Sequence, residues 1–195
     1  MNDKQVIADV QRLREELGEL HEPVANPAFI VVSGLPGTGK SYFCRKLSER
    51  LTCVVLESDA LRKVLFPSPN YNAEESYRLF QACHFLIEEL LKEGFRVILD
   101  ATNLAESRRE RLYHIADRLQ LKLIIVRVEA APELVRQRLQ NRLSRADPQD
   151  KSEADWRVYQ KMKPRVQRIE RHHFAVDTSR DITPVIDKII REAKR

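Results

Sequence analysis

The sequence has no apolar run close to the roughly 20 residues that a membrane-spanning helix needs. Its longest apolar stretches, such as residues 29–32 and 123–126, have only the length of a strand. Residues 1–20 carry acidic side chains throughout and contain no apolar core like that of a signal peptide. We therefore expect a cytoplasmic protein without a membrane partner.

Cysteine and histidine are also scarce, and neither forms a known metal-binding pattern. The three cysteines, Cys44, Cys53 and Cys83, are odd in number and match no disulfide or metal-ligand spacing. The five histidines are scattered, and the adjacent His172 and His173 would not face the same way in a regular helix or strand. The cysteines are predicted to be reduced packing residues, and the histidines predict no metal site.

The residues that are present fit one globular domain with an uneven charge. The chain has 195 residues, of which 43% are hydrophobic and 32% charged, and its net charge is +5. Residues 134–171 hold 11 Lys and Arg against 5 Asp and Glu, so the remainder of the chain is close to neutral. This concentration indicates an anionic ligand. ATP alone would satisfy it, so charge by itself does not indicate nucleic acid.

Apolar strand-like segments alternate with helical patterns along the chain. The helical period is clearest where Tyr77, Phe80, Cys83, Ile87 and Leu91 recur before Gly94. The predicted strands are residues 29–32, 53–56, 96–99, 121–128 and 174–176, and the predicted helices are residues 41–51, 73–93, 106–119, one from 132 onward, and 184–193. Strands that are apolar throughout and alternate with helices predict an α/β fold with a five-stranded, mainly parallel sheet covered on both faces.

The N-terminal segment predicts a helix that precedes the domain. Val6, Val10, Leu13, Leu17 and Leu20 follow a 4-3-4-3 spacing, which places them in one stripe on a helix. Two prolines within residues 22–27 then end the helical pattern. We expect residues 1–24 to form an amphipathic helix and linker before a P-loop domain at 25–195. The stripe either packs on the domain's own surface or forms a homodimer contact.

One segment matches the phosphate-binding pattern G-x-x-x-x-G-K-[ST] without deviation. It follows a predicted strand and opens a predicted helix, which is the context that this pattern requires. Backbone N–H groups of the loop can then surround phosphate oxygens beside a helix N-terminus. The predicted nucleotide-binding residues are Gly34, Leu35, Pro36, Gly37, Thr38, Gly39, Lys40, Ser41 and, directly after them, Tyr42.

Within this loop, Lys40 is expected to reach the β- and γ-phosphates, and Ser41 to place its hydroxyl on Mg²⁺. The loop alone does not distinguish ATP from GTP. The chain has no Asn-Lys-x-Asp sequence, which guanine-specific proteins use, and no Leu-Ser-Gly-Gly-Gln transporter signature. These two absences favour ATP and argue against a transport ATPase.

The second predicted strand leads into Asp59 and Arg62. Ligands of open α/β sheets lie beyond the carboxyl ends of the strands, so Asp59 is expected in the same crevice as the phosphate loop. On a short helix the two side chains share a face at i, i+3. Asp59 can accept the proton of an attacking hydroxyl, and Arg62 can hold the acceptor. An ordinary helix cap with a surface ion pair fits the same spacing.

The third predicted strand ends in Asp100, followed by Thr102 and Asn103. Asp100 stands where P-loop proteins often carry a second carboxylate that contacts Mg²⁺ directly or through water. Thr102 and Asn103 add neutral hydrogen-bonding groups that can contact the acceptor. A cap or turn role is the alternative for these residues, and it fits Thr102 and Asn103 better than Asp100.

Arginines then accumulate at positions 136, 138, 142 and 145, on a predicted helix that runs into a polar loop. Such a group can form a lid that excludes water and neutralises charge on the transferring phosphoryl group. The alternative is a solvated basic helix face. Arg142 is the arginine we expect in catalysis, and Arg138 the one we expect at the nucleotide.

Taken together, these segments resemble the small P-loop kinases that include bacteriophage polynucleotide kinase, zeta toxins and AAA kinase domains often fused to aminoglycoside phosphotransferase-like domains. The resemblance extends from about residue 29 to 177 and rests on GLPGTGKS, SDALRK, VILDATN, VRQRLQNR and DKSEADWRVYQKM. It implies a parallel sheet in the P-loop kinase strand order. It also implies that Asp59 is the general base, Arg62 the acceptor-binding arginine, Arg142 the lid arginine, and Arg138 a neighbour of the nucleotide.

These features predict an ATP- and Mg²⁺-dependent kinase that phosphorylates a hydroxyl of a small-molecule or nucleotide-like acceptor. Two alternatives stay open: a polynucleotide 5′-hydroxyl kinase, with nucleic acid as partner, and a regulatory P-loop ATPase that transfers no phosphate. The pair Asp59 and Arg62 favours transfer, because a switch needs no base for an acceptor. The near-neutral charge outside residues 134–171 favours a small acceptor over a polynucleotide.

Overall fold

The predicted apolar segments form a five-stranded sheet in the computed structural model, which describes residues 3–144 and 154–195. The strands are β1 (Ala28–Ser33), β2 (Val54–Glu57), β3 (Val97–Asp100), β4 (Lys122–Glu129) and β5 (Phe174–Asp177). They lie in the order β2-β3-β1-β4-β5, and all four neighbouring pairs are parallel. The predicted α/β fold class is therefore confirmed.

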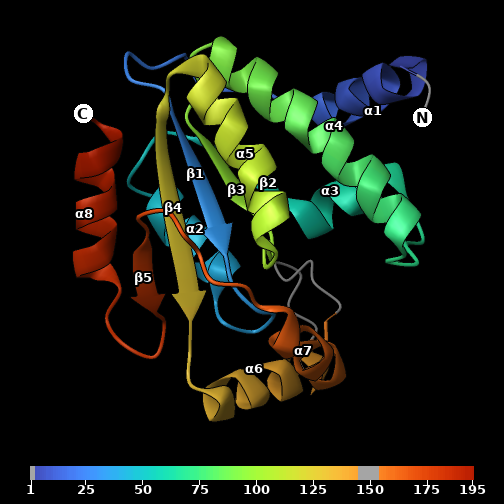
Figure 1. The fold of residues 1–195 in the computed structure, drawn as a ribbon, viewed down its shortest axis with the longest axis vertical. Coiled ribbons are helices and arrows are strands. Elements are labelled where there is room, and N and C mark those ends of the chain that lie inside the picture. The colour runs from blue at the N-terminus through green and yellow to red at the C-terminus, as the bar shows by residue number, and fades with distance from the viewer. Residues whose placement is uncertain (1–2, 145–153) are drawn as a thin grey trace.

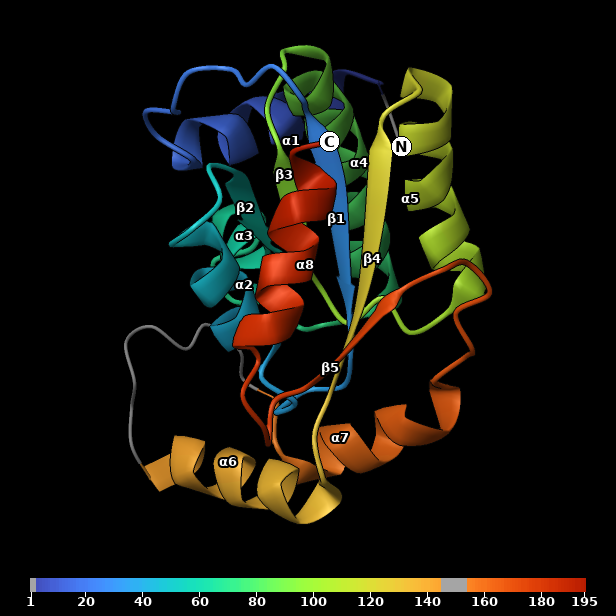
Figure 2. The same cartoon turned by 90° about the vertical axis from the view of Figure 1, so that its left-hand side faces the viewer.

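Helices cover both faces of this sheet (Figures 1 and 2). They are α1 (Asp3–Glu16), α2 (Lys40–Ser48), α3 (Ser58–Leu65), α4 (Ala73–Lys92), α5 (Glu106–Leu119), α6 (Pro132–Ser144), α7 (Trp156–Met162) and α8 (Thr183–Ala193), with a short 3₁₀ turn, η1, at Lys163–Arg165. None of the helices in the described part of the chain is both long and apolar enough to cross a membrane.

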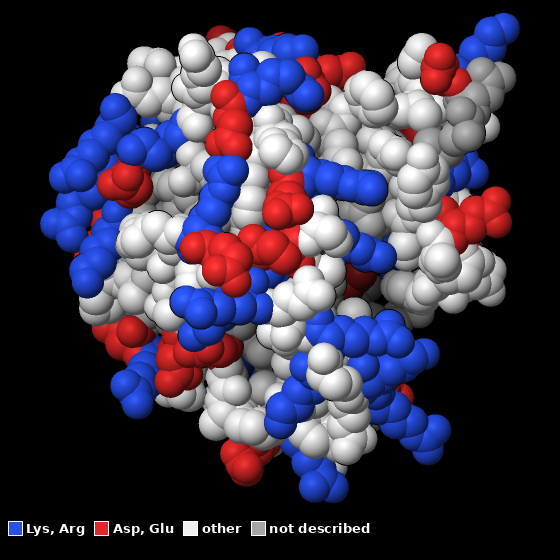
Figure 3. Space-filling view, in the orientation of Figure 1, with Lys and Arg blue, Asp and Glu red and all other residues white. Residues whose placement is uncertain are grey.

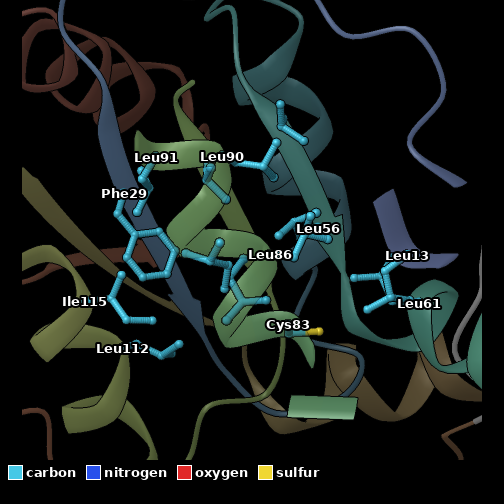
Figure 4. Close-up of a cluster of buried hydrophobic side chains, with 14 of the residues drawn as sticks. Leu13, Phe29, Leu56, Leu61, Cys83, Leu86, Leu90, Leu91, Leu112 and Ile115 are labelled. Atoms are coloured by element: carbon cyan, nitrogen blue, oxygen red, sulfur yellow. The ribbon is translucent and has the colours of Figure 1, made fainter. Parts of the chain in front are cut away.

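Alternate residues of each strand pack into two separate cores, because successive side chains of a strand point to opposite faces of the sheet. Phe29 and Val31 of β1 pack with α1, α3, α4 and α5, in the cluster that Figure 4 shows. Ile30 and Val32 pack on the other face with α2 and α8. The result is a three-layer arrangement in which the central strands are buried on both sides.

The N-terminal helix packs on its own domain. Val10 and Leu13 of the predicted stripe are buried in the α4 side of the core, and α1 lies against α3 and α4. The helix ends at Glu16, earlier than the stripe predicts, because Gly18 adopts a left-handed φ of 63°. Leu17 and Leu20 therefore reach the core from irregular chain instead of helix.

Sequence patterning did not predict α7. Its start is marked by Asp155, whose side chain accepts a hydrogen bond from the Val158 backbone N–H at 2.9 Å. The helix is seven residues long, and its only buried side chain is Tyr159. So short an apolar face leaves no periodicity to detect in the sequence.

All five strands direct their carboxyl ends to one edge of the sheet, as parallel pairing requires. In Figure 1 this edge lies at the bottom of the molecule, where α6 and α7 are placed across it. The segments that leave β1, β2 and β3 begin the phosphate loop, α3 and the loop at residues 101–105. The register sets Asp100 opposite both Val32 and Glu57, so these three segments start side by side.

Candidate active site

The phosphate loop joins β1 to α2, and its glycines stand where other residues would not fit. Gly37 and Gly39 have φ values of 76° and 92°, in the left-handed region that favours glycine. Gly34 has an ordinary φ, but a Cβ there would lie 2.4 Å from the backbone oxygen of Val128. The start of the loop is thus pressed against β4, so closely that no side chain fits at Gly34.

Helix α6 covers the loop from the other side. A Cβ on Gly37 would lie 2.9 Å from side-chain atoms of both Val135 and Leu139. These two residues form a small buried cluster with Tyr159 of α7, against which Leu35 packs. The loop conformation is therefore held by tertiary packing as well as by its glycines.

Arg138 of α6 lies beside the phosphate loop, and its contact with the nucleotide stays a prediction. Its guanidinium donates to the Thr178 hydroxyl at 2.7 Å and to the Thr178 carbonyl at 3.0 Å. The Thr178 hydroxyl in turn donates to the Thr38 carbonyl at 2.6 Å. One chain of hydrogen bonds thereby joins α6, the end of β5 and the phosphate loop.

Lys40 and Ser41 begin α2, next to the carboxylate of Asp100. The Lys40 ammonium donates to the Leu35 carbonyl at 3.2 Å, so it is folded back over the loop. Ser41 makes a side-chain hydrogen bond to Asp100. Tyr42 follows with an exposed ring, and the Arg45 guanidinium lies 5.9 Å from its centroid.

Asp100 is a buried acid of the site, with only 4% of its surface exposed. Burial raises the pKa of its carboxyl, and the nearby Asp59 carboxylate raises it further, whereas Lys40 and the Ser41 hydrogen bond oppose the shift. Its Oδ2 atom is buried and accepts no hydrogen bond from any described residue. A buried carboxylate oxygen without a donor is suited to a cation.

The surroundings of Asp100 fit magnesium. Mg²⁺ prefers oxygen ligands and commonly takes only one or two from carboxylates, the rest being water and phosphate oxygens. Asp100 and the Ser41 hydroxyl supply two such oxygens side by side. Among residues 3–144 and 154–195 there is no group of three or more His, Cys, Asp or Glu that could hold a metal without further ligands. Phosphate oxygens and water would complete the shell.

Asp59 lies in the first turn of α3, close enough to Asp100 to affect its pKa. Arg62 lies one turn later and is 6% exposed, so it is not a surface ion pair. It donates to the Ser76 hydroxyl at 3.2 Å and lies 3.7 Å from the Glu75 carboxylate. Its Nε and Nη1 atoms are buried without a hydrogen-bond acceptor among the described residues.

Glu75 is a residue that the sequence analysis did not single out. Its carboxylate accepts from the backbone N–H groups of Asn70, at 2.9 and 3.0 Å, and of Tyr71, at 2.8 Å. Asn72 completes the cap of α4 by accepting from the Glu75 N–H at 2.8 Å. The signal was present in the sequence, since Asn72 stands three residues before Glu75 at the start of a helical pattern.

Thr102 and Asn103 lie in the crevice, and their polar groups also hydrogen-bond to the backbone of the neighbouring segments. The Thr102 carbonyl accepts from the Gly34 N–H at 3.0 Å. The Asn103 side chain donates to the Val32 carbonyl at 2.8 Å, and its backbone has a φ of 44°. These bonds fix the loop after β3 against the end of β1.

The predicted arginine group divides once it is placed on α6. Arg136 lies 5.8 Å from the Trp156 ring centroid, and Arg142 donates to the Ala154 carbonyl at 3.4 Å. Arg138 alone of the three makes a hydrogen bond that reaches the phosphate-loop network, within the part of the chain described. Arg145 and the remainder of the predicted lid loop lie outside the described residues.

A cavity of about 380 Å³ adjoins this site, and the sequence analysis did not predict it. It lies between α4, the loop after β3, α5 and η1, and both Thr102 and Asn103 line it. Tyr77 and Phe80, two residues of the predicted helical period, line it as well. Gln81 and His84 interrupt that apolar stripe and were the available signal for a polar-lined face.

Comparison with known proteins agrees with this architecture. A family model described as an AAA domain matches residues 29–169. An L-seryl-tRNA(Sec) kinase from Methanococcus maripaludis is 31% identical over 114 residues, covering 56% of this chain and 44% of that protein. The chain thus spans less than half the length of that relative.

Solved structures share the fold. Kti12 of Chaetomium thermophilum, in complex with ADP-AlF3, superposes with a TM-score of 0.68 at 23% identity and covers 85% of this chain and 98% of its own. The APS kinase CysC of Mycobacterium tuberculosis, in complex with AMPPNP and APS, gives 0.67 at 14% identity and covers 87% and 99%. At these identities the likeness concerns the fold alone.

The matched range contains the phosphate loop, Asp59, Arg62 and Asp100, and the sheet around them has the fold shared with these two solved structures. The chain therefore belongs to the AAA-domain family of P-loop proteins.

Proposed function

We propose that the protein is an ATP-dependent kinase that transfers the γ-phosphate to a hydroxyl of a small-molecule or nucleotide-like acceptor. One observation carries the proposal: Asp59 follows β2 and lies beside the buried Asp100 and the phosphate loop, with a ligand-sized cavity next to them. A nucleotide switch needs no second carboxylate at this position and no adjoining cavity for an acceptor.

In this reaction the loop N–H groups and Lys40 bind the phosphates of ATP. Lys40 is folded over the loop, and its ammonium can leave the Leu35 carbonyl for the stronger acceptor that a phosphate offers. Ser41 and Asp100 would hold Mg²⁺, which would supply positive charge at the transferring phosphoryl group. Arg138, tied to Thr178, borders the nucleotide.

Asp59 acts as the base that accepts the proton of the attacking hydroxyl. It lies on the first turn of α3, beside Asp100. Arg62 lies one helical turn after Asp59 and contacts Ser76 and Glu75 of α4. Arg62 therefore positions α3 against α4. Thr102 and Asn103 line the cavity beside it, where they border the acceptor.

The comparisons support this proposal by class. The relative that is 31% identical is a kinase by name, and its named substrate is an aminoacyl-tRNA. Among the similar folds, one is an APS kinase whose structure holds an ATP analogue together with APS. A nucleotide-bearing acceptor in this protein would agree with both.

The test is transfer of labelled γ-phosphate from ATP to a panel of hydroxyl acceptors, with binding of a non-hydrolysable ATP analogue measured in parallel. Asp59→Asn should lower transfer by about 10² to 10⁴ and leave analogue binding nearly intact, because only the base is lost. Lys40→Ala should remove turnover altogether. Asp117→Asn, a change at a surface ion pair with Arg171, serves as the matched control.

Normal transfer by Asp59→Asn would contradict the assignment of the base. Wild-type turnover by Lys40→Ala would contradict the whole site. ATP hydrolysis without transfer to any acceptor would favour the regulatory ATPase instead.

A further inference from the structure

The cavity beside the proposed active site combines two kinds of surface. Tyr77, Phe80 and His84 of α4 line it on one side. Arg108 and Arg111 of α5 and Arg165 of η1 line the same cavity. Its volume of about 380 Å³ falls within the range of small-molecule sites, roughly 300 to 1,000 Å³. Figure 3 shows a hollow on this face with Lys and Arg side chains gathered around it.

The aromatic wall is open to a ligand. Tyr77 is 53% exposed, on the face of α4 that also carries the partly buried Phe80 and His84. The Arg108 guanidinium lies 5.9 Å from the Phe80 ring centroid, so a flat cation borders the flat rings. Aromatic side-chain planes are surfaces on which nucleobases stack.

The arginine side of the cavity is not neutralised by the protein. Among the described residues, no Asp or Glu lines the cavity. No described Asp or Glu forms an ion pair with Arg108, Arg111 or Arg165. Elsewhere on the same helix and its surroundings the arginines are paired: Arg118 bonds Glu88 at 2.5 Å and Arg171 bonds Asp117 at 2.6 Å. Uncompensated positive charge around a cavity is complementary to a phosphate.

His84 adds an uncharged polar group to this surface. Burial, with a smaller effect of Arg111, lowers the pKa of its imidazole to about 4. The ring is therefore neutral at physiological pH and can both donate and accept a hydrogen bond. That capacity suits the polar edge of a base better than a second anion.

The cavity also reaches the proposed reaction centre from two directions. Ser76 lines it and accepts a hydrogen bond from Arg62, which lies one helical turn after Asp59. Thr102 lines it two residues after Asp100, and its carbonyl binds the first N–H of the phosphate loop. A ligand that fills the cavity would extend toward Asp59.

We propose that this cavity binds a nucleotide unit of the acceptor, with its base against Tyr77 and Phe80 and its phosphate at Arg108 and Arg111. The role of the cavity as an acceptor site rests on the proposed kinase function, whereas binding to the cavity can be tested by itself. The shared chemistry is a base with an attached phosphate, which a free nucleotide and a polynucleotide end both supply.

Binding is measured by isothermal titration of the full chain with the phosphate loop saturated by a non-hydrolysable ATP analogue and Mg²⁺, so that added nucleotide cannot enter that loop. A nucleoside 3′-monophosphate should bind about 10- to 100-fold more tightly than the same nucleoside, as expected for a charge-assisted hydrogen bond. Ribose phosphate without a base should lose a similar factor, because base stacking is removed.

The variants assign these losses to residues. Arg108→Gln and Arg111→Gln should each weaken the monophosphate about 10-fold and leave the nucleoside unchanged. Tyr77→Ala should weaken both ligands, and Tyr77→Phe should restore them, because the ring alone is needed for stacking. Arg118→Gln removes an equal charge from the same helix at a paired surface site and should have no effect.

A short oligonucleotide with a 5′-hydroxyl distinguishes the two sources. Equal affinity for oligonucleotide and mononucleotide indicates a free nucleotide, and a much tighter, more salt-dependent oligonucleotide indicates a polynucleotide end. Equal binding of nucleoside and monophosphate, or equal effects of Arg108→Gln and Arg118→Gln, would overturn the proposal. Cavity binding that follows the expected pattern without any phosphate transfer would uphold the site and refute the kinase function.

Discussion

His84 links the cavity to the acid stability of the protein. Burial lowers the pKa of its imidazole from 6.5 to about 4, with Arg111 adding to the effect. The folded state therefore binds the proton less readily than the unfolded state between these values. Stability is fully present above pH 6.5 and is lost as the pH falls toward 4.

The size of this loss follows from the two pKa values. A difference of about 2.5 units corresponds to about 3 kcal/mol once the pH is below both values. At pH 5 most of the titration has occurred in the unfolded state, and the expected cost is about 2 kcal/mol relative to pH 7.5. For a domain of this size that corresponds to a decrease in Tm of about 4–8 °C.

The perturbation is His84→Gln, which keeps a polar side chain that does not titrate. Thermal unfolding of both proteins is followed by circular dichroism at pH 7.5 and pH 5.0. The wild type should lose about 2 kcal/mol more than the variant between these conditions, because carboxylate titrations common to both cancel in the comparison. His114→Gln, on the exposed side of α5, is the matched control. Equal losses in wild type and His84→Gln would refute the reasoning.

Three further predictions concern the framework of the site. Asp100→Asn should raise the Tm of the protein without nucleotide at pH 7.5, because the raised pKa of Asp100 in the folded state means that its charged form destabilises the fold above pH 3.8. The same change should abolish the extra stabilisation that Mg²⁺ gives to bound ATP. A lowered Tm would contradict this prediction. Gly34→Ala should cost about 1–3 kcal/mol in urea unfolding, since its Cβ would meet the Val128 backbone oxygen at 2.4 Å, and unchanged unfolding would show that β4 yields. Arg78→Ala should lower the free energy of unfolding by about 3 kcal/mol in the same assay, because it leaves the fully buried Asp9 without its ion-pair partner. Breaking a buried ion pair usually costs about 3–5 kcal/mol. A loss below about 1 kcal/mol would show that water reaches the Asp9 carboxylate.

Much of the fold could be predicted because its signals are local. Each strand is a short apolar run and each long helix has a clear period, so predicted and observed limits agree closely, as in α5 at Glu106–Leu119. The helices whose limits or existence differ from the prediction do so for local reasons that the hydrophobic pattern does not show. Gly18 ends α1 early, α2 stops at Ser48 instead of 51, and α7 is too short to show a period.

Residues of the site divide in the same way. Lys40, Ser41 and Asp100 could be placed together in advance, because parallel strands bring their carboxyl ends to one edge. The burial of Arg62 could not, since it depends on Ser76 and Glu75 of α4, a helix whose direction the sequence does not specify. Its predicted role in binding the acceptor remains a prediction, and its observed contacts are those of a positioning residue.

By itself, the sequence determined the phosphate loop, the parallel sheet and the edge at which chemistry would occur, since these depend on contiguous residues and on the period of regular structure. Only the tertiary structure decided that Tyr77, Thr102, Arg108 and Arg165 line one cavity, and that Arg138 reaches the phosphate loop through Thr178. Those residues lie far apart along the chain, and their meeting depends on how α4, α5 and α6 pack on the sheet, which the burial of many distant side chains sets jointly.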